Sequence, residues 1–205
     1  MRQNGGMTDW IALQSRAADL YDEVLPAVTD WDAATPCSDW TTREVLAHVV
    51  DEQLWVPGLL AGGTVDEVAD DLEDRLRRLR DASGPELVED WESVKAPVAA
   101  AWRGTGDDDE VHVSYGLAPA THYLAQQVFD LAVHAWDIAS SQGMDLRWGD
   151  DLERAVLEFV RTDLAENPAP ELFDPAVPGF DGPDVSARDE ALALTGRDPS
   201  AWPAR

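Results

Sequence analysis

Apolar side chains recur at intervals of three and four residues along most of this chain, which is the pattern of amphipathic α-helices. The pattern predicts a first helix over residues 8–28 and a second over residues 41–60. Thr41 followed three residues later by Glu44 is the signature of a capping box, and Gly62 marks the end of the second helix. The chain is therefore expected to begin with two helices joined by an ordered loop.

The same periodicity predicts further helices at residues 65–79, 87–102, 120–141, 150–166 and 186–194. The first of these is highly charged and only weakly periodic, so we expect it to be the most exposed. Residues 110–115 alternate apolar and polar side chains, which predicts a short strand or an extended loop. Several long helices with no more than one short strand predict an all-α protein built as a helical bundle.

Length and composition indicate how the chain is organised. With 205 residues it is long enough for one ordinary domain and short for two. We therefore expect residues 1–205 to form a single domain, in which residues 1–7 are disordered and residues 167–205 are a tail that packs on the bundle. Hydrophobic residues make up 44% of the chain and include nine Trp, which is enough apolar mass for a sizeable core.

The charge of the chain narrows the classes of partner. The formal net charge is −26, from 41 Asp and Glu against 15 Lys and Arg. Binding of nucleic acid needs a positive surface, so no nucleic-acid partner is expected. No run of about 18 apolar residues could span a membrane, and the first residues lack the apolar centre of a signal peptide. We expect a cytoplasmic protein, and its single cysteine, Cys37, fits a reducing compartment.

The histidines are the candidates for chemistry, and there are four: His48, His112, His122 and His134. His134 follows Asp130 by four residues, about one helical turn or roughly 6 Å, so the two side chains share a helix face. His48 lies in the middle of the second helix, at a position predicted to face the core. Two imidazoles and one carboxylate are a common ligand set for a divalent ion with an open coordination position.

The alternative to a metal site is structural. A buried histidine can be hydrogen-bonded in the core, and Asp130 and His134 could form an ion pair on an exposed face. Val128, Leu131 and Trp136 make the surrounding segment apolar nearly all round, so a carboxylate there needs a cation or hydrogen bonds. That requirement favours the metal interpretation.

Four more residues have a functional and a structural interpretation. Asp137 could accept the free ring N–H of His134, or it could bind the backbone or an arginine. His122, about three turns before His134, could face a substrate or lie near solvent at the start of its helix. Arg197 could bind an anionic substrate or a thiol cofactor, or it could form a salt bridge that fixes the tail. Cys37 has no basic residue close to it in the sequence, so we expect a structural role.

Two segments carry a family resemblance: DWTTREVLAHVV at residues 39–50 and FDLAVHAWDIASSQG at residues 129–143. They resemble the DinB-like superfamily, and within it the mycothiol-dependent maleylpyruvate isomerase-like metal-binding proteins of actinobacteria. The segment LALTGRDPSAW at residues 192–202 is similar to the tail of that branch. The shared features are a tryptophan-led helix start with its histidine, and a carboxylate followed after three residues by His-x-Trp-Asp.

The resemblance implies a DinB-like four-helix bundle with one long crossover, and metal ligands at His48, Asp130 and His134. It implies zinc, or alternatively nickel, and mycothiol or a similar thiol as cosubstrate. Where relatives more often carry Glu or His, this chain has Asp130, which reaches one methylene less far than Glu.

The implied function is a thiol-dependent isomerase or S-transferase that acts on a small electrophile, as a monomer or homodimer. The alternatives are a non-catalytic metal or small-ligand binding protein, a metal-dependent hydrolase, and a helical protein with an empty ancestral site.

Overall fold

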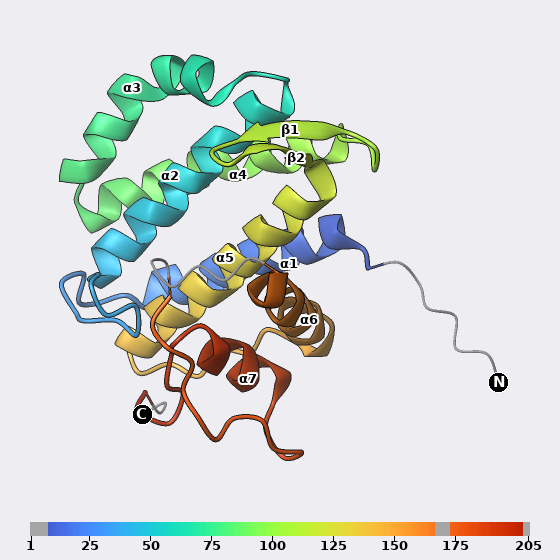
Figure 1. Ribbon diagram of the computed structural model, residues 1–205. Coiled ribbons are helices and arrows are strands. Elements are labelled where there is room, and N and C mark those ends of the chain that lie inside the picture. Colours follow the sequence, from blue (N-terminus) through green and yellow to red (C-terminus); the bar gives the residue numbers. More distant parts are fainter. Residues whose placement is uncertain (1–7, 167–172, 203–205) are drawn as a thin grey trace.

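The computed structural model describes residues 8–166 and 173–202, and helices dominate that part of the chain (Figure 1). The helices are α1 (Trp10–Val24), the short 3₁₀ helix η1 (Leu25–Ala27), α2 (Thr42–Leu60), α3 (Val65–Asp81), α4 (Gly84–Arg103), α5 (Ala120–Ser141), α6 (Asp150–Glu166) and α7 (Ala187–Leu194). Each lies where the apolar periodicity predicts a helix. The prediction of an all-α fold is confirmed.

Helices α1, α2, α4 and α5 form the central bundle. Helix α1 packs against α5 and α4, and α2 packs against α4 and α5, while α3 carries the chain from α2 to α4 along the outside of α2. Tyr21 of α1 is fully buried in the bundle, where the centroid of its ring lies 4.4 Å from that of the Trp91 ring. Its hydroxyl donates to the Leu131 carbonyl at 3.0 Å. This contact satisfies the one polar atom of a large buried side chain and ties α1 to α5.

The start of α2 is fixed by the predicted capping box. The Thr41 backbone N–H donates to the Glu44 carboxylate at 2.8 Å, and the Thr41 hydroxyl accepts from the Glu44 backbone N–H at 3.4 Å. The loop before α2 is held by Trp31, whose ring lies so close to Gly84 that a methyl group added there would sit 2.1 Å from the ring. Trp40, at the end of this loop, lies over both α2 and α5, with its ring centroid 4.7 Å from that of His48 and 5.7 Å from that of His134.

The segment between α4 and α5 differs from the sequence expectation. In place of one short strand, the structure has an antiparallel hairpin of β1 (Glu110–Val113) and β2 (Gly116–Pro119). Gly116 adopts a positive φ of 125° at the turn, which a glycine accepts without strain. The short β2 contains a glycine and a proline and exposes Leu117, so its sequence lacks the apolar alternation that identifies a strand.

The highly charged helix α3 is exposed, as expected, and among its residues only Val68 and Leu79 are buried. After α6, helix α7 packs against it (Figure 1). Near the end of the described chain, Arg197 contacts Asp137 of α5. The expected disorder of residues 1–7 lies outside the described residues. No helix in the described part of the chain is both long enough and apolar enough to cross a membrane.

Candidate metal centre

The structure brings the three predicted ligands together between α2 and α5. His48 projects from α2, and Asp130 and His134 project from α5 one turn apart. The Asp130 Oδ1 atom lies 3.2 Å from His48 Nε2 and 3.4 Å from His134 Nε2, and the two imidazole rings meet edge to face with centroids 4.9 Å apart. One potential ligand atom from each residue lies within 4.8 Å of the others, which is compact enough for a single ion.

The second carboxylate oxygen of Asp130, Oδ2, indicates that these three residues could bind a cation. Asp130 Oδ2 is buried and has no hydrogen-bond partner among the described residues. A buried polar atom left without a partner costs about 1–3 kcal/mol, and more when it is charged. A cation bound by both oxygens of Asp130 and by the two imidazoles would satisfy this oxygen as well, and nitrogen and carboxylate oxygen donors suit zinc or nickel. The residues present therefore fit a divalent metal ion.

The protonation of the site shows how strongly it attracts positive charge. Burial alone would lower the pKa of His134, but the Asp130 and Asp137 carboxylates raise it to about 9. Burial opposes ionisation of Asp130 as well, yet His134 and His48 hold its pKa below the usual range. Without a metal ion, a proton on His134 balances the Asp130 charge, and a metal ion would take the place of that proton.

Asp137 fixes the orientation of the His134 ring. It is fully buried, and its Oδ2 lies 2.9 Å from His134 Nδ1 and 3.1 Å from Arg197 Nη2. Because a buried carboxylate can only accept, Nδ1 carries the proton and Nε2 is turned toward Asp130. Both partners considered for Asp137 from the sequence, a histidine and an arginine, are therefore present together.

Arg197 is occupied by this contact. It is 7% exposed, and besides Asp137 it donates to the Thr195 carbonyl at 3.0 Å. The structure thus shows the salt bridge that links the tail to α5, which was one of the two interpretations of this residue.

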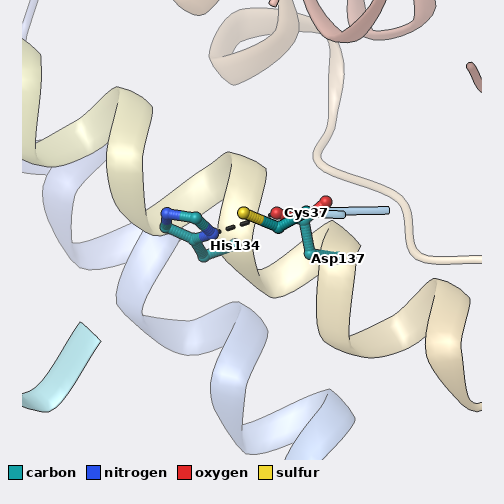
Figure 2. A group of neighbouring side chains, drawn as sticks. All are labelled: Cys37, His134 and Asp137. Atoms are coloured by element: carbon teal, nitrogen blue, oxygen red, sulfur yellow. Dashed lines mark hydrogen bonds and ion pairs between the residues drawn. The ribbon is translucent and has the colours of Figure 1, made fainter. Parts of the chain in front are cut away.

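A second group of potential ligands shares His134 and consists of Cys37, His134 and Asp137 (Figure 2). Burial raises the pKa of the Cys37 thiol to about 11, although Arg197 opposes the rise. Without a metal ion the thiol therefore keeps its proton at neutral pH, and an ion held by this group would have to displace that proton. Asp137 is already engaged by His134 and Arg197. This group fits a metal ion less well than His48, Asp130 and His134.

The candidate centre opens into a cavity of about 1060 Å³. Its wall includes the aromatic side chains Trp40, Trp55, Tyr115, Phe129, Phe159 and Phe173. His122 also lines the cavity, 3.7 Å from Asp163 on α6, so it lies on the side to which a substrate would have access. A volume of this size can hold a small molecule together with a larger thiol.

Glu52 is a further acidic residue of the cavity that was not among the site residues expected from the sequence. It lies one turn after His48 on α2 and accepts a 3.5 Å hydrogen bond from the Gln127 amide. Burial raises the pKa of the Glu52 carboxyl, and the nearby Asp130 charge adds to the rise. Its spacing from His48 is the same four-residue step that joins Asp130 to His134, and this repeated spacing was the signal available in the sequence.

Comparison with known proteins places the arrangement in a wider context. The family model described as mycothiol maleylpyruvate isomerase N-terminal domain matches residues 13–139, a range that contains all three candidate ligands. None of the curated proteins compared with the chain matches it.

Two solved structures are similar to the chain. One is a crystal structure of the mycothiol-dependent maleylpyruvate isomerase, with a TM-score of 0.59 and 17% identity over 74% of this chain and 68% of that one. The other is a mutant of that enzyme with a histidine replaced by alanine, and it matches equally well, with a TM-score of 0.59. At this level of identity the likeness establishes a shared fold, and the predicted DinB-like bundle is confirmed.

Proposed function

Since the chain belongs to the mycothiol maleylpyruvate isomerase N-terminal domain family, we propose that it is a metal- and thiol-dependent isomerase or S-transferase acting on a small electrophile. His48, Asp130 and His134 hold the metal ion in this proposal. The observation that supports it best is the Asp130 carboxylate, whose Oδ1 lies 3.2 Å from His48 Nε2 and 3.4 Å from His134 Nε2, while its buried Oδ2 has no hydrogen-bond partner among the described residues.

Zinc, or alternatively nickel, suits the three donors, and three protein ligands leave a coordination position open to the cavity. When bound, such an ion would lower the pKa of a thiol at that position, so that the sulfur becomes nucleophilic at neutral pH. Mycothiol or a similar low-molecular-weight thiol would be the cosubstrate, as the family description suggests.

The surrounding residues have separate tasks. Asp137 orients His134 through the 2.9 Å contact at Nδ1, and Arg197 holds Asp137. Glu52 faces the same cavity and has a raised pKa, which suits it to accept a thiol proton and return it to the product. The aromatic wall supplies apolar surface next to the candidate ligands.

Elemental analysis of protein purified without chelator tests the metal site. We expect about one equivalent of zinc or nickel in the natural sequence, and loss of it in His48→Ala and in His134→Ala. His112→Ala is the matched control, because His112 is an exposed residue of β1 that does not line the cavity. Stoichiometric metal in both ligand variants would show that the site is wrong.

The reaction is tested separately on metal-loaded protein. Consumption of mycothiol in the presence of electrophiles, lost in His48→Ala and kept in His112→Ala, is the expected result. Full metal content without thiol turnover would favour a binding protein. Ester or amide hydrolysis without added thiol would favour a hydrolase.

A further inference from the structure

We propose that the cavity beside the metal centre selects an electrophile with a flat, ring-like apolar body and a neutral or cationic polar group, and that it rejects dicarboxylates. This inference rests on the proposed function for the location of the reaction and deepens it by naming the substrate class. The inferred substrate differs from maleylpyruvate, the dicarboxylate named in the family's description.

The body of the substrate is inferred from a cluster of aromatic rings. Phe129 of α5 lies between Phe159 of α6 and Phe173, with ring centroids 5.9 Å and 6.0 Å apart. All three side chains are half-buried and line the cavity, so part of each ring is open to a ligand. Trp40 packs on His48 with a centroid distance of 4.7 Å and extends the aromatic surface to the candidate ligands. A flat ring can stack on such a wall and still reach the metal centre.

The charge preference is inferred from acidic residues in the same wall. Asp51, Glu52 and Asp163 line the cavity in addition to Asp130. The Asp51 carboxylate is held in place by a 2.8 Å hydrogen bond from the Trp55 indole N–H. A carboxylate ligand would be repelled by these groups, whereas a cation would be attracted to them.

The described residues that line the cavity offer one cationic Lys or Arg side chain, and it is already engaged. Among its described lining residues, the only Lys or Arg is Arg197, which is buried and engaged by Asp137. A positive charge on His122 would face Asp163, 3.7 Å away. The charge of a divalent ion would be partly neutralised by Asp130 and further reduced by a bound thiolate. A dicarboxylate would thus enter an acidic chamber in which the one arginine among the described lining residues is already paired with Asp137.

Three isosteric probes test the preference: benzamidine (a cation), benzamide (neutral) and benzoate (an anion). Their dissociation constants are measured by NMR titration with the full chain, both as purified and after metal removal. Benzamidine should bind at least about tenfold more tightly than benzoate, with benzamide between them and no saturation by maleate. Acetamidine, which has the cation without the ring, should bind at least about tenfold more weakly than benzamidine.

Variants locate the effect. Asp51→Asn/Glu52→Gln should reduce the benzamidine preference to less than about threefold, and Asp163→Asn should reduce it independently. Asp71→Asn/Glu89→Gln is the matched control, because it removes two exposed carboxylates of α3 and α4 that do not line the cavity. Circular dichroism confirms that each variant is folded.

Benzoate or maleate binding as tightly as benzamidine, in either form of the protein, would overturn the inference. An unchanged preference in both cavity variants, or failure of all three rings to bind at millimolar concentration, would also overturn it. The metal-free arm needs neither metal nor thiol. A preference that persists while elemental analysis finds no metal would therefore reject the proposed function and keep the inferred selectivity.

Discussion

The Nδ1 atom of His134 lies 2.9 Å from Oδ2 of Asp137, and this contact decides which ring nitrogen can bind a metal ion. Asp137 is fully buried and accepts from Arg197 at the same time, so it stays ionised and holds the proton on Nδ1. Nε2 is then directed toward Asp130 and His48, and it is the nitrogen that gives up its proton when a metal ion binds. The tail of the chain, through Arg197, thereby contributes to the precision of a centre that lies between α2 and α5.

The first prediction concerns this contact. Asp137→Asn should weaken zinc binding about 10–100-fold. The amide is uncharged and can donate as well as accept, so it no longer holds the proton on His134 Nδ1 or fixes the orientation of the ring. It should also lower the free energy of unfolding by about 3 kcal/mol or more, since Arg197 is left as a buried unpaired cation. Chelator competition and urea denaturation measure the two effects.

Asp145→Asn is the control for this change. Asp145 is an exposed carboxylate that also contacts an arginine, Arg188, at 3.5 Å, but it lies away from the cavity. Its substitution should change zinc affinity by less than about twofold, because exposed ion pairs contribute little. Equal zinc affinity in Asp137→Asn and the natural sequence would contradict the orienting role.

The second prediction follows from the pKa of His134, which the Asp130 and Asp137 carboxylates raise to about 9 against the opposing effect of burial. A metal ion must displace the His134 proton. Apparent zinc affinity should therefore rise by up to about tenfold for each pH unit until pH approaches about 9. Zinc dissociation constants measured by competition across the neutral range test this, and a pH-independent affinity would contradict it.

The metal-free protein should respond in the opposite direction. The folded-state pKa of His134 lies above its unfolded value, so the protonated pair with Asp130 stabilises the fold fully below about pH 6.5. That contribution is lost as pH rises toward about 9. Metal-free protein should accordingly melt at a lower temperature at mildly alkaline pH, and saturating zinc should remove most of this dependence.

Local features of the fold could be predicted from the sequence because their causes lie within a few residues. The apolar periodicity located the long helices, and Thr41 with Glu44 located the start of α2. The second strand of the hairpin was missed, since Gly116 and Pro119 remove its alternation. The pair of Asp130 and His134 could be predicted from a four-residue step on one helix.

Other features of the site depend on contacts between distant parts of the chain. Arg197 lies beside Asp137 only because the tail returns to α5. From the sequence alone, Arg197 could have bound an anionic substrate or a thiol cofactor, or formed a salt bridge. Arg197 also opposes the rise in the pKa of the Cys37 thiol, and this effect likewise depends on the return of the tail to α5. Phe129 and Phe173 form one aromatic wall although nothing in their local sequence indicates it.

The third prediction concerns the loop that carries Trp40. Gly84→Ala should destabilise the protein by about 1–3 kcal/mol, because the added methyl group would overlap the Trp31 ring and more than cancel the helix preference of alanine. Urea denaturation measures the loss. Gly104→Ala is the control, since its methyl group would meet only backbone atoms at 3.4 Å or more. Equal stability of the two variants would show that Trp31 does not anchor the loop.

The last prediction separates the two groups of potential ligands that share His134. If His48, Asp130 and His134 hold the metal ion, Cys37→Ser should keep full metal content with an affinity within about threefold of the natural sequence. The half-buried Cys37 thiol, with its pKa raised to about 11, should also react slowly with iodoacetamide at neutral pH, with or without zinc. If Cys37, His134 and Asp137 hold the ion instead, Cys37→Ser should lose it while His48→Ala retains it. The two groups use opposite nitrogens of the same ring, so occupation of the second would require Asp137 to release Nδ1 and would break the contact that orients the first.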